Sequence, residues 1–315
     1  MPRTARKKSP SGIYHIMVRS ISEVILFKNS KDKDKYLEII KKFKEIYLFD
    51  IYAYCLMNSH AHIIIDCCMA DISKIMKSIN QSYSSYYNYK YNRHGHVFQD
   101  RFKSKIIDND NYLMTLTAYI HNNPKDIKAY SAEVSKYPYS SLGIFLGRHK
   151  DKYDIVNHKH ILDYFSKDIF SARKTYIGFI QRLYNIDNIK DAEKLQIEAE
   201  FLGDKSDYRS ERNFILRNLL PDTIVEHISK ISGTNFNPRI KHIHSNTELK
   251  ALFVIIMRSL SDYSLKDICL YINNNTLSNI WKLSEIGFNL ISKDAKYNSL
   301  FKNLISTYRN YIPAV

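Results

Sequence analysis

Two histidines separated by one residue are the first candidates for chemistry. His60 and His62 lie in segment 60–66, whose isoleucine-rich run predicts a β-strand. Side chains two residues apart on a strand leave the same face of a sheet, so both imidazoles can bind one metal ion. The motif is weak by itself, because the chain has 12 histidines and similar pairs occur at 94–96 and 158–160.

A tyrosine and an asparagine follow at helical spacing. Tyr119 lies four residues before Asn123, at the end of a helix predicted from Asp110 to about Asn122 and ended by Pro124. If this helix packs beside the histidine strand, Asn123 could complete a metal site and Tyr119 could face the group that the metal polarises. The alternatives are a core aromatic for Tyr119 and a helix cap for Asn123.

Other tyrosines compete with Tyr119 as a nucleophile. Tyr112 lies on nearly the same helical face, but its eleven-residue separation from Asn123 is about 16 Å along the axis. A second predicted helix, from Asp71 to about Tyr91, is rich in tyrosine. Its tyrosines could be nucleophiles, stacking platforms for bases or packing residues: Tyr83, Tyr86, Tyr87, Tyr89 and Tyr91.

The elements that must position these side chains follow the order β-α-β-β-α-β. Strands are predicted at 13–19, 49–57, 60–66 and 103–107, and helices at 31–47 and 71–91. This order is typical of a ferredoxin-like (split βαβ) α+β fold, an antiparallel sheet with both helices packed on one face.

The strong positive charge indicates a polyanionic partner. The net charge is +15, and 44% hydrophobic residues are too many for a disordered basic tail. With 25 Tyr beside one Trp, the composition suits a surface that stacks bases, although AT-rich coding bias could produce the same excess. A basic segment gives the candidate phosphate or base contacts, with a solvated loop as the alternative: Arg93, His94, His96, Arg101, Lys103 and Lys105.

The C-terminal region is predicted to be all-α. Four short helices are expected at 248–260, 265–272, 276–291 and 295–308, and the second and third have helix-turn-helix proportions. A plain helical bundle is the alternative. The expected domains are 1–150, which holds the candidate site, a helical connecting region at 151–237, and a DNA-binding domain at 238–315.

The cysteines and the hydropathy indicate a compartment. The four cysteines show neither a CxxC spacing nor a zinc pattern, so a reducing environment fits best. No run of 18 apolar residues occurs. We therefore expect a cytoplasmic protein without a membrane partner.

Three separated segments resemble one known family. Residues 55–65, 91–104 and 119–124 look like the single-tyrosine HUH transposases, specifically the REP-associated branch, and the likeness spans roughly 9–145, through the Tyr-Pro-Tyr-Ser-Ser run at 137–141. Ala61 departs from the bulky apolar residue of the family but leaves both histidines intact. The terminal helices, from about Leu252 to Trp281, are similar to the DNA-binding domain of bacterial replication initiators.

The resemblance implies an activity and roles for the candidate residues. His60, His62 and Asn123 would bind Mg²⁺ or Mn²⁺, and Tyr119 would attack a phosphodiester to form a 5′-phosphotyrosine. The implied protein is a single-strand DNA endonuclease and strand transferase that acts on hairpin-bearing DNA, as a monomer or homodimer. The rivals are a non-catalytic DNA-binding regulator on the same scaffold and an RNA-binding protein.

Overall fold

The chain folds into two compact units. The computed structural model describes residues 9, 12–185, 212, 214–240, 246–273 and 276–310. One unit contains residues 1–45 and 49–212, and the other contains residues 46–48 and 213–312. Each unit is described by itself below.

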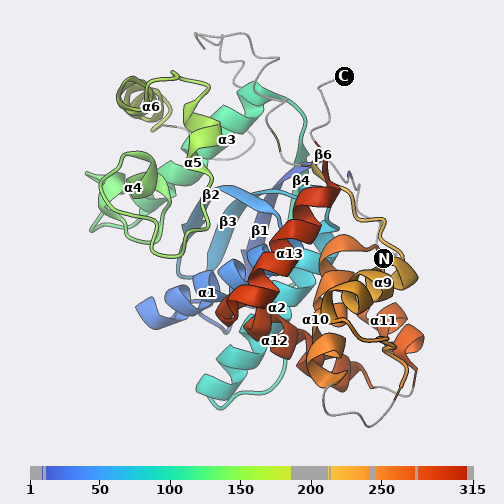
Figure 1. Cartoon of the computed structure of the whole chain (residues 1–315). Coiled ribbons are helices and arrows are strands. Elements are labelled where there is room, and N and C mark those ends of the chain that lie inside the picture. The colour runs from blue at the N-terminus through green and yellow to red at the C-terminus, as the bar shows by residue number, and fades with distance from the viewer. Residues whose placement is uncertain are drawn as a thin grey trace. The chain divides into compact units, whose positions relative to one another are not determined.

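A four-stranded antiparallel sheet forms the centre of the first unit (Figure 1). Its strands are β1 (Ile13–Arg19), β2 (Asp50–Leu56), β3 (His60–Asp66) and β4 (Lys103–Ile107), in the order β2-β3-β1-β4. Helices α1 (Ser30–Tyr47) and α2 (Ile72–Lys90) complete the β-α-β-β-α-β succession. The predicted ferredoxin-like α+β fold is therefore confirmed.

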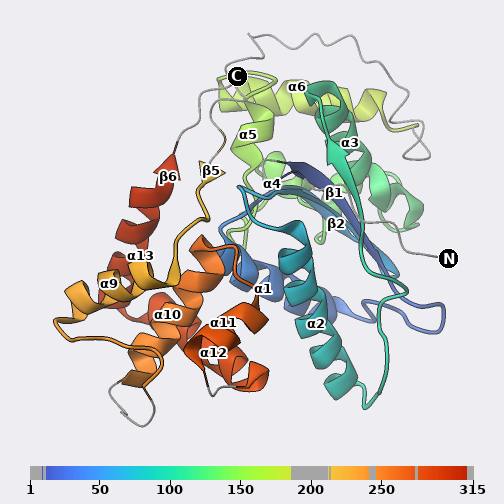
Figure 2. The ribbon, with the colours of Figure 1, turned by 90° about the vertical axis from the view of Figure 1, so that its right-hand side faces the viewer.

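The helix that carries Tyr119 covers the other face of this sheet. Figure 2 shows α1 and α2 on one side of the sheet and α3 (Asp110–Asn122) on the opposite side. Asn109 begins α3 by accepting a hydrogen bond from the Tyr112 backbone N–H, at 2.7 Å. The chain then tightens into a 3₁₀ turn, Asn123–Asp126, that contains Pro124.

A buried histidine fastens α3 to the edge of the sheet. The two ring nitrogens of His121 lie 2.7 Å from Ser141 Oγ and 2.7 Å from Tyr176 Oη. The Tyr54 N–H on β2 donates to the same Ser141 hydroxyl, at 2.9 Å. The 137–141 run thus connects β2 to α3, and it follows a second 3₁₀ turn, Val134–Lys136.

Three more helices pack beside α3. They are α4 (Leu142–Phe145), α5 (His158–Leu162) and α6 (Ile169–Arg182), and their buried residues share one apolar core with α3 and β2. Residues 151–185 of the expected connecting region lie in the first unit, where Tyr176 and Phe179 of α6 are buried in that core. Residues 186–211 of the expected connecting region lie outside the described residues.

The second unit is mainly helical. It contains α9 (Pro221–Ser232), α10 (Asn246–Leu260), α11 (Leu265–Ile272), α12 (Leu277–Lys293) and α13 (Ala295–Tyr308), plus a short pair, β5 (Phe214–Ile215) and β6 (Arg309–Asn310). α10 and α12 approach closely at Gly287, where an added Cβ would lie 2.3 Å from the Ala251 carbonyl oxygen. Among the described helices of the chain, none is both long and apolar enough to cross a membrane.

Candidate active site

The register of the sheet gathers the candidate ligands on one face. β1 pairs with β3 so that Met17 lies opposite His62 and Arg19 lies opposite His60. Residues opposite one another in antiparallel strands share a face, as do alternate residues of one strand. We call this surface the histidine face; it contains His15, Met17 and Arg19 of β1, His60 and His62 of β3, and Lys103 and Lys105 of β4.

Each of the two predicted metal-binding histidines has its Nδ1 occupied. His62 Nδ1 lies 2.9 Å from His15 Nε2, and His60 Nδ1 lies 3.1 Å from Ser59 Oγ. The two imidazole rings are 5.1 Å apart between centroids. This arrangement leaves the Nε2 atoms of His60 and His62 for a ligand, as in histidines that bind metals.

Burial keeps both imidazoles neutral. The pKa of His62 lies well below its ordinary value because the ring is buried, and His15 and His60 add to the shift. Burial lowers the pKa of His60 too, with a further contribution from the positive charge of Arg19. A neutral imidazole is the form that binds metal ions, so neither histidine needs to lose a proton at neutral pH.

Tyr119 lies against this pair. The rings of Tyr119 and His62 meet edge to face, with centroids 6.0 Å apart. Burial raises the pKa of Tyr119, and the carboxylate of Asp126 raises it further. The phenol therefore keeps its proton at neutral pH.

Asn123 shares the last turn with Tyr119. Its Nδ2 donates to the Tyr119 backbone carbonyl at 2.9 Å, which fixes the orientation of the amide and leaves Oδ1 as an acceptor. Asn123 is also the C-cap residue of α3, so the predicted cap and the predicted ligand are compatible. Nδ2 of this side chain therefore serves the helix, and Oδ1 is left as a candidate ligand.

The candidate donors are a mixed set of nitrogen and oxygen atoms that can bind a divalent cation. Two imidazole nitrogens and an amide oxygen are available from His60, His62 and Asn123. In the described part of the chain, no group of three or more His, Cys, Asp or Glu side chains is arranged to hold a metal. The residues therefore fit an incomplete coordination shell, which leaves positions for substrate oxygens.

The competing tyrosines are occupied by packing. Tyr112 is 9% exposed, and the Lys105 ammonium lies 4.7 Å from its ring centroid. In the tyrosine-rich helix, Tyr83 and Tyr87 donate to the carbonyls of Leu26 and Ile25, while Tyr86 and Tyr91 donate to Asp32. Tyr89 differs, with 91% of its surface exposed.

Four of the six predicted DNA-contacting residues lie on two surfaces. Lys103 and Lys105 lie on the histidine face. His96 and Arg101 line a groove of about 900 Å³ between α2 and the loop 95–102, with Lys77, Gln81 and Gln99 among the other lining residues. We call it the α2 groove. His94 is exposed, whereas Arg93 is half-buried with its guanidinium 5.9 Å from the Tyr87 ring centroid.

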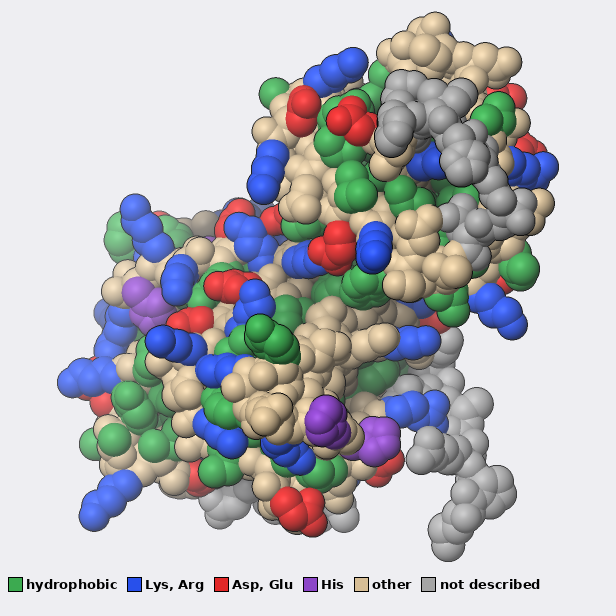
Figure 3. All heavy atoms as spheres, turned by 90° about the horizontal axis from the view of Figure 1, so that it is seen from below, with side chains coloured by type: hydrophobic (Ala, Val, Ile, Leu, Met, Phe, Trp, Pro, Cys, Tyr) green, Lys and Arg blue, Asp and Glu red, His purple; other side chains and the backbone are tan. Residues whose placement is uncertain are grey.

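The α2 groove carries polar groups without partners. Within the described ranges, no hydrogen bond or ion pair engages the side chains of Lys77, Gln81, His96, Gln99 or Arg101. The loop is held beside the end of β1, because Ile21 donates to Val97 and Gln99 donates to Arg19 through the backbone. Asp100 is the acidic residue of this groove. Figure 3 shows Lys and Arg side chains spread over one face of the molecule.

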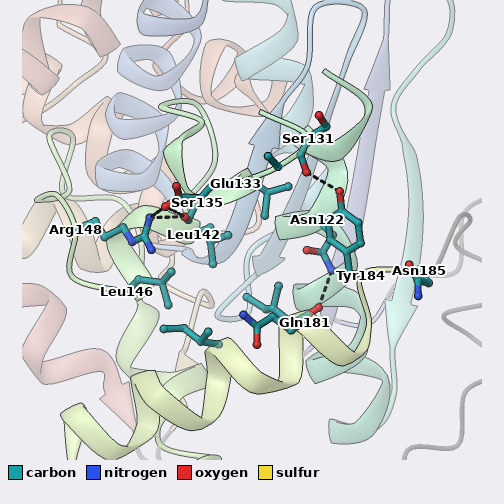
Figure 4. Close-up of a pocket in the computed structure, with 14 residues that line it drawn as sticks. Asn122, Ser131, Glu133, Ser135, Leu142, Leu146, Arg148, Gln181, Tyr184 and Asn185 are labelled. Carbon is teal, nitrogen blue, oxygen red and sulfur yellow. Dashed lines mark hydrogen bonds and ion pairs between the residues drawn. The ribbon is translucent and has the colours of Figure 1, made fainter. Parts of the chain in front are cut away.

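A second pocket, of about 490 Å³, lies between α3, α4 and α6 (Figure 4). Asn122 Nδ2 donates to the Ile180 carbonyl at 3.1 Å, and Arg148 forms an ion pair with Glu133. Leu142 and Leu146 form part of its apolar wall. These contacts connect α3 to α6 beside the pocket, while Asn122 Oδ1 is buried there without a hydrogen-bond partner.

Sequence reasoning missed three residues near the site. His15 and Arg19 alternate with Met17 along β1, which places them on one face, but only the pairing of β1 with β3 brings them to His62 and His60. Asp126 follows Pro124, and its charge acts on both His60 and Tyr119. The alternation of side chains along segment 15–19 is the sequence signal that could have identified His15 and Arg19.

Residues 8–123 match the family model described as "Transposase IS200 like". The matched segment contains the whole sheet and α3.

One solved structure is similar to the chain. It is described as the REP-associated tyrosine transposase bound to a REP hairpin, with 20% sequence identity and a TM-score of 0.41. The match covers 47% of this chain and 87% of the other. No curated protein matches the chain.

Proposed function

We propose that the protein is a metal-dependent single-strand DNA endonuclease and strand transferase of the REP-associated kind, acting on hairpin-bearing DNA. The contact between the rings of His62 and Tyr119 carries this proposal, because it joins the best metal ligand to the best nucleophile. The three sequence motifs support the branch, and the match of 8–123 supports the family.

The proposed ligands are His60 Nε2, His62 Nε2 and Asn123 Oδ1. These atoms would hold Mg²⁺ or Mn²⁺, which would supply charge stabilisation to the scissile phosphate and to the departing 3′ oxygen. The Nδ1 contacts to Ser59 and His15 orient the two rings.

The proposed reaction exchanges one phosphodiester for another. A bond forms between the Tyr119 phenolic oxygen and phosphorus as the bond from phosphorus to the 3′ oxygen breaks. The phenol loses its proton and the 3′ oxygen gains one, leaving a 5′-phosphotyrosine and a 3′-hydroxyl. Attack by a 3′-hydroxyl reverses the exchange, so joining needs no nucleotide cofactor.

In this proposal, two groups of basic residues bind different parts of the DNA. Arg19 and Lys103 are exposed beside the proposed ligands on the histidine face, where they suit the phosphates next to the cut. His96 and Arg101, with the amides of the α2 groove, suit the hairpin.

A covalent adduct tests the proposal. We expect the chain, incubated with Mn²⁺ and hairpin-bearing single-stranded DNA from the flanks of its own gene, to form a protein–DNA adduct that maps to Tyr119. Tyr119→Phe removes only the hydroxyl, so it should bind the hairpin and form no adduct. Tyr112→Phe is the matched control on the same helix and should still form it.

The metal dependence is tested in the same assay. His60→Ala should abolish the adduct while hairpin binding persists, and a chelator should reproduce that loss. An adduct at residue 112 or in the 83–91 cluster would refute the assignment of the nucleophile. Absence of any adduct from the wild-type chain favours the regulator, and equal binding of the same hairpin as RNA favours the RNA-binding protein.

A further inference from the structure

A third histidine, His15 on β1, contacts the proposed metal-binding pair without belonging to it. Its Nε2 lies 2.9 Å from His62 Nδ1, and the two rings are nearly parallel, with an interplanar angle of 14° and centroids 5.2 Å apart. Both rings are buried, at 5% and 3% exposure. His15 thus directs Nε2 toward His62, which separates its role from that of a ligand.

Two proton arrangements satisfy this contact, but only one permits metal binding. If His15 Nε2 carries the proton, it donates to His62 Nδ1, and neutral His62 then carries its own proton on Nε2. If His62 Nδ1 carries the proton, it donates to His15 Nε2, and the Nε2 lone pair of His62 is available. The nitrogen that carries the proton in a neutral imidazole is set by the hydrogen bond that the other nitrogen makes.

We propose that His15 is a positioning residue that accepts a hydrogen bond from His62 Nδ1–H and so holds His62 with Nε2 toward the metal. This inference rests on the proposed function. The sheet makes the contact rigid, because Met17 of β1 pairs with His62 and places His15 diagonally across from it. His60 has no such strand partner for Nδ1 and uses the neighbouring Ser59 hydroxyl.

Mn²⁺ binding to the full chain without DNA tests the inference, with the free ion followed by electron paramagnetic resonance. Removal of an outer partner of a metal-binding histidine lowers metal affinity by about 10–100-fold. We expect His15→Phe, which keeps an aromatic ring but cannot accept, to weaken Mn²⁺ binding by that factor. His15→Gln retains an acceptor oxygen and should recover most of the affinity.

Two further measurements separate positioning from packing. Hairpin affinity in metal-free buffer and the unfolding temperature should be similar for His15→Gln and the wild type. Imidazole nitrogen NMR with Mg²⁺ should place the His62 proton on Nδ1. If His15→Phe binds Mn²⁺ as the wild type does, the inference is wrong and the proposed function stands. A proton on His62 Nε2 in the presence of Mg²⁺ overturns both the inference and the assignment of His62 as a ligand. A wild-type chain that binds no Mn²⁺ overturns both.

Discussion

His62 and His121 are both buried imidazoles, yet their surroundings give them different roles. His62 uses Nδ1 for one contact and leaves Nε2 open on the histidine face. His121 has both nitrogens engaged, by Ser141 and Tyr176, and no exposed surface. A free nitrogen next to Tyr119 makes His62 a candidate ligand, whereas full engagement makes His121 a structural residue.

His121 should make the first unit sensitive to acid. Burial lowers its pKa from 6.5 to about 3. Below pH 6.5, His121 binds a proton in the unfolded chain, whereas in the folded chain it stays neutral until about pH 3. The free energy of unfolding therefore falls as the pH falls through this range. One such group contributes a slope of about 1.4 kcal/mol per pH unit.

Urea unfolding between pH 7 and pH 4 measures that slope. We expect His121→Gln to reduce the loss of stability on acidification, even if it lowers stability at pH 7. Burial also lowers the pKa of other histidines, including His60 and His62. These residues remain in the variant, so part of the pH dependence of stability persists. An unchanged slope would mean that His121 is not the group that titrates.

At the scale of elements, the close approach of α10 and α12 depends on one glycine. The Cβ of Gly287→Ala would lie 2.3 Å from the Ala251 carbonyl, so the helices must separate. Such overpacking typically costs about 1–3 kcal/mol. Thermal unfolding should show a clear loss of stability for this variant.

Gly178→Ala on α6 is the matched control. No atom lies within 4 Å of the position of its added Cβ, and its backbone is helical. Alanine in a helix interior is favoured over glycine by roughly 0.5–1 kcal/mol, so this change should be neutral or stabilising. Equal losses in the two variants would contradict the argument from helix packing.

The α2 groove should contribute counterion release on DNA binding. Lys77 and Arg101 line it and make no ion pair with the described residues. Loss of a phosphate contact lowers the slope of log affinity against log salt by about 0.7 for single strands and 0.9 for duplex. We expect Lys77→Ala and Arg101→Ala each to weaken hairpin binding with a slope change of about this size.

Lys159→Ala controls for net charge in that titration. Lys159 is exposed and forms an ion pair with Asp163 on α5, outside the α2 groove. The Lys159→Ala substitution removes the same unit charge and should leave the slope of log affinity against log salt nearly unchanged. Equal slope changes for all three variants would show that the net charge of the chain, rather than this groove, sets the salt dependence.

In the whole molecule, we expect the two units to have different functions. All of the proposed catalytic residues lie in the first unit. In the second, α11 and α12 are the helices for which the sequence predicts a helix-turn-helix, and Ser278 and Asn279 are exposed at the start of α12. We propose that this unit binds DNA and adds selectivity.

A chain ending at residue 212 tests that division. We expect it to remain folded and to form the Tyr119 adduct, because the sheet, α3 and their apolar core are complete within it. Hairpin affinity or selectivity should fall. Circular dichroism and adduct yield check the outcome; loss of the folded state would show that the second unit is required for the stability of the first.

The sequence by itself determined most elements of this protein. The predicted strands at 13–19, 60–66 and 103–107 and the helices at 265–272 and 295–308 coincide with β1, β3, β4, α11 and α13. Alternation, helical spacing and turn residues are local signals, so they can be read without knowing the fold. The same local spacing placed Tyr119 and Asn123 on one helical turn.

Only the tertiary structure decided which elements meet. His15 and His62 are 47 residues apart, and their contact exists because β1 pairs with β3. Four tyrosines of the 83–91 cluster are packing residues because their hydroxyls donate hydrogen bonds to Asp32 and to the carbonyls at 25–26, whereas Tyr89 is exposed. Likewise, α5 and α6 belong to the first unit because their buried side chains share an apolar core with α3. Contacts between distant segments depend on how apolar faces are buried together, and that is a property of the whole fold.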